Sequence, residues 1–194
     1  AVVLVFLGLP PSYEAEGYDR EHLELPPQQV SVLEAVAQVN REVVVVLSNG
    51  AAVTVHPWQR HARAVLEGWL LGQAGGSAVA DLLTGRAAPS GRLAETIPLR
   101  AADTPTVGAF PGERGHVRYG EGLLIGYRWY DAHELPVVYP FGHGLTYTRF
   151  VWSDVEATVG RDTPAAPGAT THTADDDARV AVEVAVTVTN AGAR

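Results

Sequence analysis

Two carboxylates stand two residues apart in a loop near the start of the chain. Glu14 and Glu16 lie in the segment S12-Y-E-A-E-G-Y-D-R20, directly after an apolar run over residues 1–9. A positioned carboxyl group can donate and accept a proton as a general acid and base. A glutamate in a polar loop is more often a solvated charge, so the spacing alone leaves both interpretations open.

The residues beside Glu16 suit the control of such a carboxylate. Arg20 can orient it, and burial against Tyr18 would raise its pKa towards general-acid use. Gly17 allows the backbone an unusual conformation at this point. These features favour acid/base chemistry in the loop.

The elements around the loop indicate an α/β layer fold with a mostly parallel sheet. Residues 2–7 and 43–47 are continuous aliphatic runs, typical of parallel strands covered on both faces. Residues 28–40 predict an amphipathic helix, with Pro27 in its first turn and Asn40 at its end. Residues 64–69 predict a third strand and residues 77–84 a short helix. In such sheets, ligands bind beyond the carboxyl ends of the strands. The acidic loop leaves its strand at that end.

The second half of the chain has a different amino-acid composition. Residues 89–147 are rich in Gly, Pro and aromatic residues, and we expect an ordered excursion wrapped over the core. A short strand over 151–155 precedes a Pro/Ala/Thr-rich stretch, and an alternating strand over 180–189 follows. We expect this last strand to begin a separate all-β module.

These patterns divide the chain into an α/β sandwich over 1–155, a linker or loop over 156–178, and the first part of an all-β module over 179–194. The chain opens directly on a buried strand and closes on a strand with no partner after it, which is not stable alone. We therefore expect it to be part of a longer polypeptide.

Composition excludes several classes of function. The formal net charge of −8 argues against a nucleic-acid or anionic-membrane surface. No apolar segment reaches the roughly 20 residues of a membrane span. The absence of cysteine excludes disulfides and thiolate zinc sites. It does not fix the compartment, so a cytoplasmic and a secreted location both stay open.

Three other motifs can be explained by packing or turns without a function. The run G72-Q-A-G-G-S77 lacks the lysine and spacing of a phosphate loop, and tight packing explains it better. The seven histidines show no metal-ligand pair, and His143 between two glycines suits a turn. Glu121 and the aromatic stretch Y127-R-W-Y130 could line a sugar site, but an aromatic packing cluster fits them equally well.

Read in order, the motifs of the chain resemble glycoside hydrolase family 3, the β-glucosidase-like enzymes, over about residues 1–155. The late motifs P89-S-G-R-L93 and P140-F-G-H-G-L-T-Y-T148 are the most specific. The others are E16-G-Y-D-R20, L25-P26, V43-V-V-V-L-S-N-G50, P57-W58, G68-W-L-L-G-Q73, A78-V-A-D-L-L-T-G85, T96-I-P98 and Y119-G-E-G-L-L-I-G-Y-R-W-Y-D131.

The resemblance implies roles for the acidic loop. In this family an upstream (β/α)8-type barrel supplies an aspartate nucleophile, and the α/β sandwich supplies the general acid/base from a loop. Glu16 matches the acid/base, because it precedes G-Y-D-R in the motif, and Glu14 is the runner-up. Tyr18, Asp19 and Arg20 are predicted to hold the loop, and Glu121 is a weaker candidate for an ordering or substrate-side contact.

The resemblance also sets the expected function. It implies part of a retaining, exo-acting β-glycosidase, for which we favour β-glucosidase over β-xylosidase, N-acetylglucosaminidase and arabinofuranosidase. No barrel stands in these residues, so the chain alone is expected to be inactive, and its partners are the barrel and a glycoside. No metal or organic cofactor is implied. T189-N-A-G192 resembles the start of a fibronectin type III-like domain, and F110-P-G-E113 resembles a subgroup with an inserted lectin-like domain.

Two rivals belong to other classes. The chain could be a non-catalytic carbohydrate-binding or scaffold domain, which the absence of an upstream aspartate nucleophile would indicate. It could also be a nucleotide-binding α/β domain, which would require a phosphate ligand at residues 72–77. The sequence leaves linkage preference and oligomeric state open.

Overall fold

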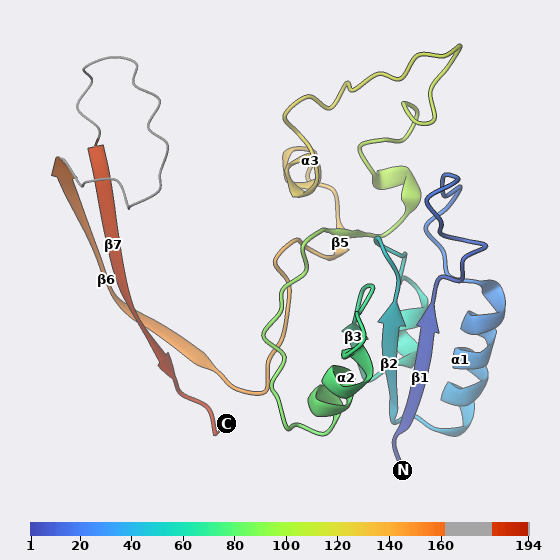
Figure 1. Cartoon of the computed structure of the whole chain (residues 1–194), viewed down its shortest axis with the longest axis horizontal. Coiled ribbons are helices and arrows are strands. Elements are labelled where there is room, and N and C mark those ends of the chain that lie inside the picture. Colours follow the sequence, from blue (N-terminus) through green and yellow to red (C-terminus); the bar gives the residue numbers. More distant parts are fainter. Residues whose placement is uncertain (162–179, 194) are drawn as a thin grey trace. The chain divides into compact units, whose positions relative to one another are not determined.

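The computed structural model of the chain describes residues 1–161 and 180–193. These residues form two compact units, Ala1–Leu145 and Thr146–Arg194 (Figure 1). The two units are described separately below.

A three-stranded parallel sheet forms the centre of the first unit. It contains β1 (Val3–Gly8), β2 (Val43–Ser48) and β3 (Ala64–Glu67), in the order β1-β2-β3. All three strands were predicted, β1 and β2 from their continuous aliphatic runs, in which β-branched side chains favour the extended backbone. Because the strands are parallel, their carboxyl ends meet at one edge of the sheet.

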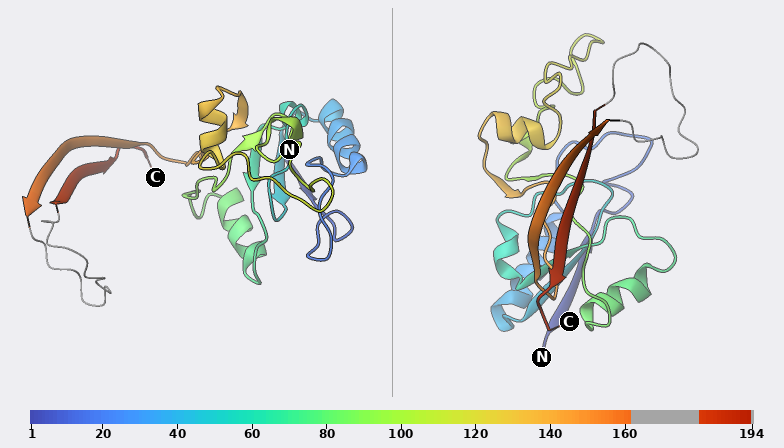
Figure 2. Two further views of the ribbon diagram at one scale, coloured as in Figure 1. Left: turned by 90° about the horizontal axis from the view of Figure 1, so that it is seen from above. Right: turned by 90° about the vertical axis from the view of Figure 1, so that its left-hand side faces the viewer.

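Two helices complete the layers. The helix α1 (Pro27–Val39) begins with a proline in its first turn and ends at Asn40, as predicted. The helix α2 is Gly75–Leu83, and Figure 2 shows α1 and α2 on opposite sides of the sheet. A side chain at Gly75 would lie 2.6 Å from Leu71 Cβ, so close packing explains this glycine. Each helix of the described residues is too short or too polar to span a bilayer.

The main core lies between α1 and one face of the sheet. Leu33 of α1 is completely buried there, next to Val43 and Val45 of the central strand. The short 3₁₀ helix η1 (Trp58–His61) seals one end, and the Trp58 indole donates a hydrogen bond of 3.0 Å to the carbonyl of Thr54.

The first strand is covered on one face only, which corrects the expectation of burial on both faces. Val5 and Leu7 are buried, while the alternate side chains Leu4 and Phe6 are 45% and 64% exposed. The strand is at the edge of the sheet, and its second face stays partly open to solvent at Leu4 and Phe6. A continuous aliphatic run therefore does not by itself establish two covered faces.

The long excursion after α2 is ordered, as expected from its aromatic content. It contains β4 (Ile97–Pro98), η2 (Ala101–Asp103), α3 (Tyr127–Ala132) and β5 (Val137–Tyr139), and β4 pairs with β5 in an antiparallel ladder.

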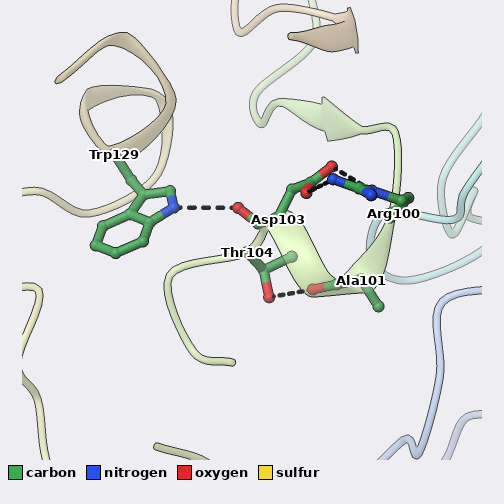
Figure 3. Close-up of polar contacts among 5 residues, drawn as sticks. All are labelled: Arg100, Ala101, Asp103, Thr104 and Trp129. Atoms are coloured by element: carbon green, nitrogen blue, oxygen red, sulfur yellow. Dashed lines mark hydrogen bonds and ion pairs between the residues drawn. The ribbon is translucent and has the colours of Figure 1, made fainter. Parts of the chain in front are cut away.

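Asp103 connects the parts of this excursion (Figure 3). Its buried carboxylate accepts two hydrogen bonds from Arg100, of 2.6 and 3.2 Å. Its backbone carbonyl accepts a hydrogen bond of 3.1 Å from the indole of Trp129. The bidentate ion pair closes η2 locally, and the indole contact fixes α3 to η2.

The second unit is an antiparallel pair of long strands. The strand β6 covers Phe150–Arg161 and pairs with β7 (Val180–Asn190), with an irregularity between Ser153 and Glu156. Two expectations are corrected here. The predicted strand over 151–155 extends to residue 161, through part of the expected linker, because alternation continues there. This strand also pairs with β7, so the expected boundary at residue 155 divides a ladder.

The rest of the expected linker, residues 162–179, lies outside the described residues. The assignment of β7 to a fibronectin type III-like module stays a prediction.

The packing of α1 predicts a large difference between two neighbouring positions on this helix. Leu33→Ala should lower the free energy of unfolding by about 2–5 kcal/mol, because it leaves a cavity beneath the sheet. Val32, 57% exposed, is the matched control, and Val32→Ala should change the free energy by less than about 0.5 kcal/mol. Urea unfolding of both variants, followed by tryptophan fluorescence, measures the difference. Equal losses would contradict this packing.

Candidate active site

The acidic loop over residues 9–26 leaves β1 at the carboxyl edge of the sheet. A tight turn closes it, with an antiparallel bridge between Ala15 and Tyr18. We call residues 14–20, which contain this turn, the acidic turn. The hydroxyl of Tyr18 donates a hydrogen bond to the carbonyl of Pro11, which ties the turn to the start of the loop. Glu16 stands at the tip of this turn and is exposed. The expected burial of Glu16 against Tyr18 is therefore not found in this domain, because the turn points its central residues into solvent.

Glu14 is tied to the neighbouring strand connection. Its Oε2 accepts a hydrogen bond of 2.9 Å from the backbone N–H of Gly50, just after β2. Glu14 is partly buried, whereas Glu16 makes no hydrogen bond or ion pair with the described residues. The two candidate carboxylates therefore have different surroundings, with one bound to the scaffold and the other free.

Arg20 attaches the end of the acidic turn to the same connection. Its Nη1 donates a hydrogen bond of 3.1 Å to the carbonyl of Ala52. Asp19 is exposed and contacts no polar partner in the described parts of the chain. Tyr18 thus binds another residue of the loop, and Arg20 binds the connection after β2. Asp19 makes neither kind of contact. The loop-holding roles of all three residues stay predictions.

A second group of carboxylates lies at this edge of the sheet, and the sequence did not reveal it. Burial raises the pKa of Glu67 above its usual 4.5, and the carboxylate of Glu95 raises it further. Hydrogen bonds from the Trp69 N–H (2.9 Å) and from Asn49 Nδ2 (3.4 Å) to Glu67 oppose this rise in pKa.

The carboxyl group of Glu95 is also perturbed. Burial raises the pKa of Glu95, while the N–H of Ala52 and the charge of Arg20 lower it. The Arg20 Nη2 atom is buried and makes no hydrogen bond within the described residues, so the Glu95 carboxylate balances its charge. The rule that chemistry gathers at strand carboxyl ends could have identified Glu67, which ends β3. Glu95 gave no such signal.

Glu121 lies in a different part of the unit. It lines a cavity of about 880 Å³ whose walls come from residues 105–129, and no residue of the acidic loop belongs to that lining. In the aromatic stretch, Tyr127 stacks on Phe141 at 5.0 Å and Tyr130 is buried, which favours packing. His143 lies in a turn closed by its N–H and the carbonyl of Pro140, as expected.

Comparison with known proteins gives consistent matches. Residues 1–147 match the family profile described as the glycosyl hydrolase family 3 C-terminal domain. An exo-α-(1→6)-L-arabinopyranosidase of Bifidobacterium longum is 50% identical over 95% of this chain. Thermostable β-glucosidase B of Acetivibrio thermocellus is 49% identical over 79% of it. The chain spans 25% and 20% of the lengths of these two relatives.

A solved structure has a similar fold. The crystal structure of a family GH3 β-glucosidase of Bifidobacterium adolescentis has a TM-score of 0.80 and 42% sequence identity. The match covers 99% of this chain and 32% of that one.

The raised pKa of Glu67 predicts a pH-dependent effect of its replacement. The folded chain binds this proton more tightly than the unfolded chain, whose pKa is near 4.5. Stability from this group is therefore complete below that pH and is lost as the pH rises through the folded-state pKa. Glu67→Gln cannot ionise, so it avoids this loss of stability, and its amide oxygen can still accept the Trp69 N–H. The Tm of the variant minus the Tm of wild type should therefore be larger at about pH 7 than at about pH 4.

Differential scanning calorimetry at both pH values measures this difference. Glu21→Gln, which changes an exposed carboxylate of the same loop, is the control and should give no trend. A Glu67→Gln difference that stays constant or shrinks with rising pH would contradict the burial of this charge.

Proposed function

The chain belongs to the glycosyl hydrolase family 3 C-terminal domains, and from this premise we propose that it supplies the general acid/base of a retaining β-glycosidase, carried by Glu16. One observation carries the assignment. Of the two carboxylates in the acidic turn, Glu14 is bound to the Gly50 N–H while Glu16 is free at the tip. A carboxyl group that must reach a glycosidic oxygen needs that freedom.

The proposed reaction uses two carboxyl groups about 5–5.5 Å apart, which is the separation in retaining enzymes. An aspartate of an upstream barrel domain attacks the anomeric carbon and forms a glycosyl-enzyme. The carboxyl group of Glu16 gives its proton to the leaving oxygen in the same step. The resulting Glu16 carboxylate then takes a proton from water, which attacks the anomeric carbon and releases the sugar.

The preferred substrate is a terminal, non-reducing β-D-glucoside. The β-glucosidases among the relatives and solved structures support this choice. β-Xylosides, N-acetylglucosaminides and arabinofuranosides remain alternatives. This chain does not distinguish them, because we expect the sugar-selecting side chains to lie in the barrel.

A second substrate is favoured by a specific comparison. The 50% identical Bifidobacterium longum relative bears the name of an exo-α-(1→6)-L-arabinopyranosidase. An α-L-arabinopyranoside has the ring of a β-D-galactoside without the hydroxymethyl group, so the same retaining chemistry applies to it. Rates on the aryl β-D-glucoside and the aryl α-L-arabinopyranoside would decide between the two substrates.

The role of Glu16 predicts a specific chemical rescue in the full-length protein. Glu16→Ala should slow hydrolysis of an aryl β-D-glucoside by about 10²–10⁴-fold, because proton transfer to and from the reacting oxygens is lost. Added azide needs no proton removal to attack the glycosyl-enzyme, so it should restore turnover and yield a β-glycosyl azide. The rate and the product, followed by absorbance and NMR, test both statements.

The same experiment also tests the alternative of a non-catalytic scaffold or carbohydrate-binding domain. If neither azide nor the Glu16 replacement changes turnover, Glu16 is not the acid/base. If the full-length wild-type protein has no activity on any of these glycosides, a scaffold or carbohydrate-binding role for the domain replaces the catalytic one.

A further inference from the structure

We propose that Glu14 is a positioning residue that sets the place of Glu16 by binding the backbone of Gly50. The inference rests on the proposed function, since it assigns Glu14 a part in the acid/base step that Glu16 performs. It also gives residues 49–52, just beyond β2, the role of a seat for the acidic turn. We call these four residues the β2 seat.

The contact between Glu14 and the β2 seat is close. Glu14 Oε2 accepts the Gly50 N–H at 2.9 Å. A Cβ atom at Gly50 would collide with the Glu14 carboxylate and would lie 3.2 Å from Leu70 Cδ1. Only glycine therefore leaves room for the carboxylate to approach the backbone here. Changing either residue should displace the turn.

Hydrogen bonds of Asn49 and Arg20 hold the β2 seat in place. Asn49 is completely buried, and its Nδ2 donates to the carbonyl of Ala51 at 2.9 Å and to Glu67 Oε2 at 3.4 Å. Arg20 binds the carbonyl of Ala52 from the other end of the turn. The acidic turn thus has two attachment points on a segment of four residues. Between these points, the chain carries Glu16.

The short distance along the chain makes Glu16 sensitive to its neighbour. Two residues of extended chain span only about 7 Å, so a shift of Glu14 moves Glu16 by a similar amount. Proton transfer requires hydrogen-bond reach to the leaving oxygen, and a misplacement of about 1 Å costs up to roughly 10²-fold in rate. The loss should appear only where the leaving group needs the proton.

The test compares leaving groups in the full-length protein. Glu14→Ala and Gly50→Ala should each lower kcat/KM by about 10- to 100-fold on phenyl β-D-glucoside, a poor leaving group that needs acid assistance. On 2,4-dinitrophenyl β-D-glucoside, which departs without a proton, both variants should stay within about threefold of wild type. This second substrate also reports the folded fraction of each variant.

Two matched variants separate the hydrogen bond from general damage. Glu14→Gln retains an oxygen that can accept the Gly50 N–H, so it should recover most of the phenyl glucoside activity lost in Glu14→Ala. Glu21→Ala removes an exposed carboxylate of the same loop and should match wild type. Azide should give no β-glycosyl azide with Glu14→Ala, because the carboxylate of Glu16 still repels the anion.

Each result decides the matter. Equal losses on both aryl glucosides, or wild-type rates for both Glu14→Ala and Gly50→Ala, would overturn the positioning role. A β-glycosyl azide from Glu14→Ala would make Glu14 the acid/base itself and would also overturn it. Failure of the proposed function has a different signature, namely a Glu16→Ala protein with wild-type activity on phenyl β-D-glucoside.

Discussion

The backbone N–H of Gly50 is the contact on which the arrangement of the acidic turn depends. It exists because β2 is the central strand of the sheet, so the residues that follow it emerge at the carboxyl edge beside the loop from β1. Burial of Val43, Val45 and Leu47 fixes where that strand ends. The hydrophobic core thus determines where the Gly50 N–H lies, and this N–H binds the Glu14 carboxylate.

Arg20 and backbone N–H groups offset the charges of the carboxylates that lie beneath the acidic turn. Burial raises the pKa of both Glu67 and Glu95, and the charge of Glu95 raises the pKa of Glu67 further. Arg20 offsets this rise in pKa at Glu95, and backbone N–H groups offset it at both sites. Arg20 therefore has two roles, because it also anchors the turn through the carbonyl of Ala52.

The sequence predicted the elements well and the contacts poorly. Aliphatic runs identified β1 and β2, and Pro27 and Asn40 marked the ends of α1, because these signals are local. The exposed face of β1 and the pairing of β6 with β7 depend on residues distant in sequence. The same is true of the contact between Glu14 and Gly50, 36 residues apart. The family motifs singled out Glu16, while the separate surroundings of the two carboxylates required the structure.

A crystal structure of the full-length protein with a non-hydrolysable thioglycoside tests the assignment of Glu16 as the acid/base. The Glu16 carboxyl group should lie within hydrogen-bond distance of the scissile sulfur. Glu14 should still bind the Gly50 N–H in that complex. Glu14 at the scissile atom, with Glu16 directed into solvent, would contradict the assignment.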